Sequence, residues 1–158
     1  MKKYKGVIIF LMFVFLFGGC ATISKTPQVA SPTFMFYEAP KDKIWPLLIA
    51  EVALSYPVAA IEKESGLLTT DFVSMPAGFN NQNMTKWVFH PGGFFATWNG
   101  LRMKMNIMVI EIGTDKTKVI IKAHYEAFEN NVSKKWVVCR TNGVVEYGIL
   151  TRIKYQWR

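Results

Sequence analysis

The chain has 158 residues and a formal net charge of +8 at neutral pH, and 51% of its residues are hydrophobic. A domain usually spans about 100–200 residues, so this length accommodates one domain and excludes a multidomain enzyme. Lys2, Lys3 and Lys5 form a basic head without acids, and leaving them out lowers the net charge to +5. The remaining composition is that of an ordinary globular domain, which excludes a disordered or polytopic membrane chain.

The N-terminus predicts an export signal. After the basic head come twelve uncharged and mostly apolar residues, 6–17, followed by Gly18, Gly19 and Cys20. A helix needs about 20 apolar residues to cross a bilayer, whereas a shorter run is typical of a secretory signal peptide. We therefore expect residues 1–19 to be a signal peptide.

The two glycines and Cys20 resemble the bacterial lipobox, in which a cysteine preceded by small residues receives a diacylglycerol. The resemblance implies a covalent lipid of palmitate type on Cys20, no other cofactor, and a stable membrane anchor because several acyl chains are buried. Ala21 stands where aspartate favours inner-membrane retention in such families, which implies an outer membrane address facing the periplasm. Residues 20–32 would then be a lipidated N-terminus and flexible leash. The alternative is an ordinary signal peptide with an incidental cysteine.

A single domain is expected at 33–158, and it begins with a strand over 33–38 and a helix. Asp42 is the candidate N-cap of this helix, and Pro46 is expected in its first turn. Apolar residues cover more of the helix than one stripe. We therefore expect it to be buried on most sides, either gripped by a curved sheet or covered by a partner.

Strands follow the helix. Runs at 57–62 and 67–73 flank Gly66 and predict a hairpin. A strand from about 102 changes its apolar phase at Ile110, which suggests a bulge. Alternation over 118–127 predicts one buried and one solvated face, and a strand at 135–140 follows. We interpret the C-terminal segment as a helix over about 142–154, although residues 153–158 also alternate with period two.

This order of elements predicts an α+β fold, with an antiparallel sheet wrapped on helices. Three segments also carry a family resemblance, and they read KIWPLL at 43–48, IEKESGLLTTD at 61–71 and CRTNGVVE at 139–146. They are similar to helix-grip lipoproteins related to the BamC (NlpB) family of outer-membrane assembly lipoproteins. The resemblance implies a helix-grip fold and an accessory role in outer-membrane assembly, with assembly subunits as partners.

An aromatic segment is the candidate partner-binding site, and it contains Trp87, Phe89, Phe94, Phe95 and Trp98. In one interpretation, 86–90 and 94–98 form a hairpin that turns through 91–93, with its aromatic side chains in the core. In the other, the hairpin tip is exposed and binds a partner or touches lipid, because contiguous exposed apolar surface marks interaction sites.

Catalytic signatures were sought in the residues. His90 and His124 fall on separate predicted strands, Cys139 reads as a small buried hydrophobe, and no metal-ligand spacing or nucleophile elbow is visible. The acids Glu62, Glu64 and Asp71 read as a solvated rim. We therefore predict a non-enzyme: a membrane-tethered periplasmic lipoprotein that binds other envelope proteins.

A carrier of an apolar ligand is the alternative, which a continuous cavity under the first helix would favour. A nucleic-acid partner is not expected, and it becomes relevant only if four basic side chains share one exposed stripe with aromatic residues. These four are Arg102, Lys104, Lys118 and Lys122.

Overall fold

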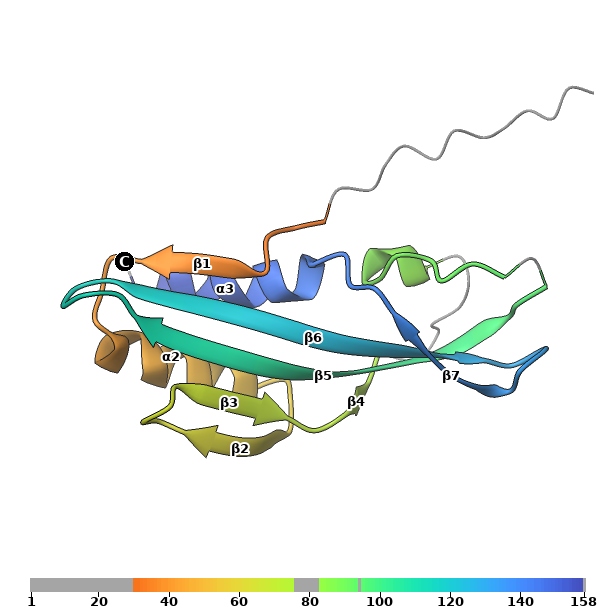
Figure 1. Ribbon diagram of the computed structural model, residues 1–158, viewed down its shortest axis with the longest axis horizontal. Coiled ribbons are helices and arrows are strands. Elements are labelled where there is room, and N and C mark those ends of the chain that lie inside the picture. Colours follow the sequence, from red (N-terminus) through yellow and green to blue (C-terminus); the bar gives the residue numbers. More distant parts are fainter. Residues whose placement is uncertain (1–29, 76–82, 94, 158) are drawn as a thin grey trace, which may run out of the picture.

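The computed structural model describes residues 30–75, 83–93 and 95–157, so Cys20, the predicted signal peptide and Phe94 lie outside the described residues. Over these residues the fold is α+β, with one seven-stranded antiparallel sheet and two α-helices (Figure 1). The elements are β1 (Phe34–Tyr37), α2 (Lys41–Ala53), β2 (Val58–Glu62), β3 (Leu67–Thr70), β4 (Val73–Ser74), the 3-10 helix η1 (Met84–Lys86), β5 (Trp98–Glu111), β6 (Thr117–Glu129), β7 (Lys135–Cys139) and α3 (Val144–Trp157).

The long strands β5 and β6 form a central hairpin that runs the length of the molecule (Figure 1). At one end the strand order is β1-β6-β5-β3-β2, and at the other end β4 pairs with β5 and β7 with β6. Both helices lie behind the sheet in Figure 1, on what we call its inner face, and the opposite face is the outer face. The predicted order of strand, helix, strands and helix is therefore confirmed.

The alternation along β6 has its predicted consequence. Val119, Ile121 and Tyr125 are fully or almost fully buried on the inner face, whereas Lys118 and Lys122 lie on the outer face. The bulge suggested at Ile110 is wrong. The β5–β6 pairing is continuous from Gly100 to Glu111, and its only described irregularity lies between residues 98 and 100. Ile110 instead stays on the outer face, where 38% of it is exposed.

The start of α2 differs from the prediction. Asp42 is not the N-cap: the cap position is Pro40, whose ring favours the extended conformation seen there, at φ −67° and ψ 154°. Asp42 lies in the first turn and pairs with Lys63 at 3.0 Å. Pro46 is the sixth helical residue rather than a first-turn residue, so it removes one backbone hydrogen bond near the helix start.

Burial of α2 on most sides is also wrong. The helix buries one side through Ile44, Trp45, Leu48 and Val52, and its other side faces solvent. Leu54, directly after the helix, is 81% exposed. The sheet thus covers one side of α2, and α3 packs beside it.

The predicted hairpin of β2 and β3 is confirmed, with Gly66 at φ +71° in its turn. A Cβ at Gly66 would come within 2.2 Å of the Val109 carbonyl oxygen, so only glycine fits here. β3 ends at Thr70, earlier than expected. Its hydroxyl accepts a hydrogen bond from the Met105 N–H at 2.9 Å, in place of a backbone carbonyl.

The C-terminal segment is helical to Trp157, so the period-two alternative for its end is wrong. Asn142 Oδ1 accepts a hydrogen bond from the Val144 N–H at 3.1 Å and so caps α3. Gly143 has φ +78°, and a Cβ there would come within 2.2 Å of the Ser31 carbonyl oxygen. The Ser31 N–H in turn donates to the Asn142 carbonyl oxygen at 2.8 Å. The chain is therefore fixed against the start of α3 from residue 31 onward.

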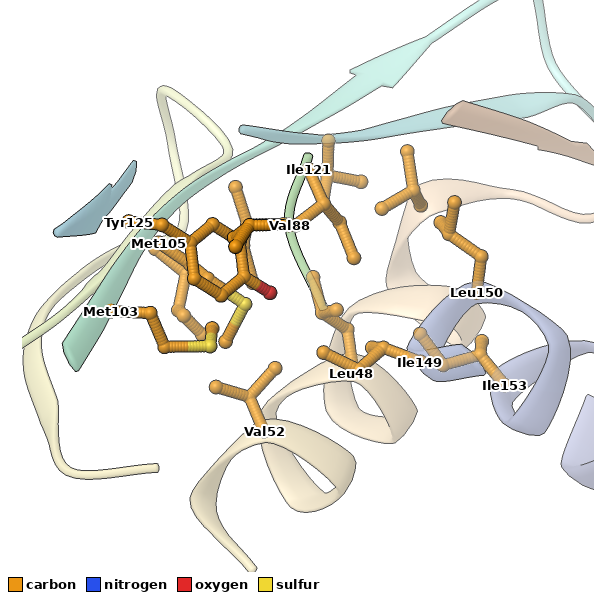
Figure 2. Close-up of a cluster of buried hydrophobic side chains, with 14 of the residues drawn as sticks. Leu48, Val52, Val88, Met103, Met105, Ile121, Tyr125, Ile149, Leu150 and Ile153 are labelled. Carbon is orange, nitrogen blue, oxygen red and sulfur yellow. The ribbon is translucent and has the colours of Figure 1, made fainter. Parts of the chain in front are cut away.

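The core lies between the helices and the inner face (Figure 2). It combines apolar side chains of both helices with those of β5 and β6, and Figure 2 labels Leu48, Val52, Val88, Met103, Met105, Ile121, Tyr125, Ile149, Leu150 and Ile153. Each of these is 0% exposed. Burying one such side chain contributes about 1.5–3 kcal/mol, so this cluster is the main stabilising feature of the fold.

Candidate protein-binding surface

The structure separates the aromatic residues that the sequence grouped together. Trp98 is buried with 4% exposure, and Trp87 and Phe89 are half-buried. Phe95 is 72% exposed. Of the predicted partner-binding residues that the structure describes, Phe95 is therefore the one that offers most of its ring to a partner.

The predicted hairpin between 86–90 and 94–98 is wrong. Val88 forms a bridge with Thr141, and the Phe89 N–H donates to the Arg140 carbonyl oxygen at 2.9 Å. The segment thus pairs with the chain that enters α3. Val88 is apolar and fully buried, and the chain after β7 offers it both a backbone partner and a place in the core.

Glu129, at the end of β6, organises the loops around Phe95. Its carboxylate accepts hydrogen bonds from the backbone N–H groups of Thr97 at 3.2 Å, Asn131 at 2.7 Å and Val132 at 2.9 Å, and also from Ser133. The Ser133 bond first, and then the others, lower the pKa of Glu129 to about 2. A carboxylate that accepts several backbone N–H groups is strongly stabilised in its charged form. Glu129 therefore fixes two loops at once.

The two loops present apolar side chains to solvent. Phe95 is 72% exposed and Val132 is 71% exposed, and we call this pair the apolar tip. Asn131 Nδ2 donates to the Phe95 carbonyl oxygen at 2.9 Å, so the two loops lie side by side. Sequence reasoning missed Val132 and Glu129. The available signal was an apolar residue without a periodic partner in the polar turn 129–133.

A second aromatic group lies on the outer face. The Arg102 guanidinium carbon is 4.5 Å from the ring centroid of Phe72 and 4.3 Å from that of Trp136. Two guanidinium nitrogens contact Glu126 Oε2, at 2.7 and 2.5 Å. His124 Nε2 lies 3.1 Å from Glu126 Oε1, and this contact first, followed by Arg102, lowers the pKa of Glu126. We call this group the outer-face stack.

The outer face also carries the four basic residues whose arrangement was left open. Arg102 and Lys104 on β5, and Lys118 and Lys122 on β6, share this face with aromatic residues of β1 and β7. The arrangement named as the condition for considering nucleic acid is therefore present.

The candidate catalytic groups remain apart or take up structural roles. His90 Nδ1 accepts a hydrogen bond from the Gly92 N–H at 3.0 Å, while His124 belongs to the outer-face stack. Cys139 is 5% exposed, and burial raises the pKa of its thiol. Glu62 accepts a hydrogen bond from the Ser65 hydroxyl within the β2–β3 turn. Within residues 30–75, 83–93 and 95–157, no three His, Cys, Asp or Glu side chains form a group suited to a metal ion.

Glu146 is a buried acid that sequence reasoning did not single out. It is 0% exposed at the start of α3, and its Oε1 accepts a hydrogen bond from the Thr141 hydroxyl at 2.7 Å. Desolvation raises the pKa of its carboxyl group. Its place inside the fold, beside the cap of α3, makes it a structural group rather than a surface acid.

Comparison with known proteins identifies no family for this chain. No protein-family model matches the chain, and no curated protein is similar enough to count as a relative. Over the part of the chain that the structure describes, no helix has the length and apolar character to cross a membrane.

Proposed function

We propose that this chain is a non-catalytic lipoprotein that binds another protein of the bacterial cell envelope through its apolar tip. The proposal places the lipid on Cys20 and the protein at the outer membrane, facing the periplasm. The observation that carries the binding role is the exposure of Phe95 and Val132 on loops that Glu129 holds in place.

Loops fixed in this way favour binding. A mobile loop loses conformational freedom when it binds, at about 0.5–1.5 kcal/mol for each immobilised side chain. Because Glu129 has already ordered residues 131–133 and Thr97, much of that cost is met during folding. Large apolar side chains held in solvent on an ordered loop are typical of interaction sites.

The finer fold assignment is part of the same proposal. The chain order of β1, α2, six further strands and α3 agrees with a helix-grip arrangement, in which the sheet curves around helices. The resemblance of 43–48, 61–71 and 139–146 to BamC-related lipoproteins supports an accessory role in outer-membrane assembly. Subunits of the assembly machinery are therefore the first partners to test.

The anchor is tested by acylation. Cells that express the chain are fed radiolabelled palmitate, and we expect label on the mature chain and none on a Cys20→Ser variant. An unlabelled and freely soluble mature chain would remove the membrane tether from the proposal.

The binding role is tested by site-specific photo-crosslinking in the same cells. A crosslinking residue replaces Val132, and the control replaces Leu54, which is 81% exposed beside the helices. We expect an envelope protein to be captured at 132 and not at 54, and capture to fall when Glu129→Ala frees the loops. Equal capture at both positions, or none at 132, would contradict the proposal.

The alternative carrier function has less support. The described side chains between α2 and the sheet, such as Leu48, Met105 and Ile121, belong to one continuous buried cluster (Figure 2). An apolar ligand would have to displace part of this cluster, at the cost of those contacts. Recovery of a stoichiometric lipid that is not bound to Cys20 would favour the carrier.

A further inference from the structure

The outer face near β1 combines exposed apolar side chains with lysines that form no ion pair among the described residues. Phe34, Phe36, Met108 and Ile110 are 46%, 44%, 46% and 38% exposed. Such side chains are usually covered, and four of them on one flat surface indicate a site of interaction.

The strand register brings these side chains together. Ile120 on β6 is paired with Phe34 on one side and with Met108 on the other, so the three form one row across the sheet. Lys118 lies between Phe36 and Ile110 in the next row. Rows two residues apart along a strand are separated by about 7 Å, so the two rows form one patch. We call it the basic-apolar face.

The charge of this face is positive. Lys116 is paired with Glu38 at 2.8 Å, but no described carboxylate lies within 4.0 Å of the Lys118 or Lys122 ammonium. The Lys118 ammonium lies 4.8 Å from the Phe34 ring centroid and 5.5 Å from that of Phe36. Lys118 therefore stands among the apolar side chains, and Lys122 lies two residues beyond Ile120 on the same face of β6, opposite Asn106. Both carry charge that is available to an anionic partner.

We propose that the basic-apolar face docks on an anionic phospholipid surface, with Phe34 and Phe36 at headgroup level and Lys118 and Lys122 against the phosphates. Aromatic side chains interleaved with lysines are the composition of interfacial binding surfaces. The proposal rests on the proposed lipid anchor, which brings the domain to that surface. The leash between Cys20 and Ser31 spans at most about 40 Å when fully extended, so the bilayer within reach of this face is the one that would hold the anchor.

Other occupants fit this face less well. A second copy of the chain would bring the same lysines close to one another, and like charges in contact are unfavourable. Single-stranded nucleic acid needs open ring faces on which bases stack. Phe34 and Phe36 instead meet edge to face, at 83° and 5.9 Å, and Lys118 lies near both rings.

Docking is measured on the full mature chain reconstituted into vesicles with brominated acyl chains, through the fluorescence of a Phe36→Trp variant compared with its parent. We expect strong quenching in vesicles that contain phosphatidylglycerol, weaker quenching in phosphatidylcholine alone, and reversal by high salt. Val132→Trp, at the other end of the sheet, is the matched control and should stay unquenched. Circular dichroism confirms that each variant is folded.

A charge variant then tests the lysines. Each lysine near an anionic surface raises the membrane-binding constant about fivefold. Lys118→Gln with Lys122→Gln should therefore lower the ratio of docked to undocked protein about 25-fold. The matched control, Lys86→Gln with Lys135→Gln, removes the same charge from η1 and β7 and should have little effect.

Several results would overturn the proposal. The first is an absence of quenching at position 36 in anionic vesicles. This result counts against the docking face when the chain stays on the vesicles after a salt wash, because retention shows that the lipid anchor is intact. Loss of the chain in that wash instead contradicts the anchor, and the face is then tested by adding the vesicles to unanchored chain. Tighter binding to an oligonucleotide, or dimers abolished by Phe36→Asp, would assign the face to another occupant.

Discussion

Met105 and Met108 lie three residues apart on β5, yet the inner face buries the first completely and the outer face leaves 46% of the second exposed. The inner face is therefore stabilised by the removal of apolar area from water, which is large and needs no particular partner geometry. The outer face is ordered by contacts between cations, rings and carboxylates, such as those of Arg102. Such contacts are individually weak, so this face can change without loss of the fold.

The strongest test of this contrast replaces one methionine on each face of β5 with alanine. Met105→Ala should lower the free energy of unfolding by about 2–5 kcal/mol, because it leaves a cavity in a filled core. Met108→Ala should lower it by less than about 1 kcal/mol, since its side chain already meets water. Urea unfolding of both variants gives the two values, and equal losses would show that the faces do not differ.

The link between the helices is expected to have the next largest effect. Glu51 is 6% exposed, and its Oε1 accepts a hydrogen bond from Arg152 Nε at 2.5 Å. Arg152→Ala leaves this carboxylate buried with a weaker partner, which should cost about 1–3 kcal/mol. A double-mutant cycle with Glu51→Gln measures the coupling, and additive losses would indicate that the pair does not interact.

The outer-face stack should contribute less. Arg102→Lys keeps the charge but loses the planar contact with Phe72 and Trp136, and the expected loss is about 1 kcal/mol. Lys122→Ala, on the same face and without an ion pair among the described residues, is the control, and its unfolding midpoint should be unchanged. A larger loss for Lys122→Ala would mean that charge rather than stacking orders this face.

The pH dependence of stability tests the same contrast through two buried acids, whose contributions differ in sign. Burial raises the pKa of Glu146, so the stabilising contribution of its proton is complete at low pH and is lost as the pH rises through the raised pKa. The pKa of Glu129 is lowered to about 2, so its contribution is present above about pH 4.5 and is lost as the pH falls toward 2. Glu146→Gln should flatten the first dependence and leave the second. Stability measured by urea unfolding across pH checks both, and an unchanged profile in the variant would contradict the first.

Periodic segments were the predictable part of this fold. The alternation along β6 and the glycine of the β2–β3 turn place those strands correctly, because side-chain period and positive φ are local properties. Ile110 led to the wrong prediction of a bulge, because an apolar residue on the outer face resembles a shift in the alternation of buried and exposed residues. The start of α2 was misplaced because aspartate is a favoured N-cap residue, whereas the helix begins after Pro40, which makes no side-chain cap hydrogen bond.

The candidate site was predicted only in part. Phe95 was among the named residues, but Trp98 belongs to the core, and Val132 became visible only when the folded chain placed its loop beside Phe95. Glu129 could not be assigned a role, because its four backbone partners lie in two separate loops. Tertiary hydrogen bonds of this kind leave no periodic signal in the sequence.

The contact between Gly143 and Ser31 would set how far the domain extends from the proposed lipid anchor. If Cys20 carries the proposed acyl anchor, the segment from Cys20 to Ser31 reaches no more than about 40 Å when fully extended. A partner of the proposed lipoprotein would then have to lie within reach of a domain held close to the bilayer. A longer segment between Cys20 and Ser31 would let the domain reach partners further from the membrane. It would also lower the effective concentration of the domain at the membrane surface, because effective concentration falls as a tether lengthens.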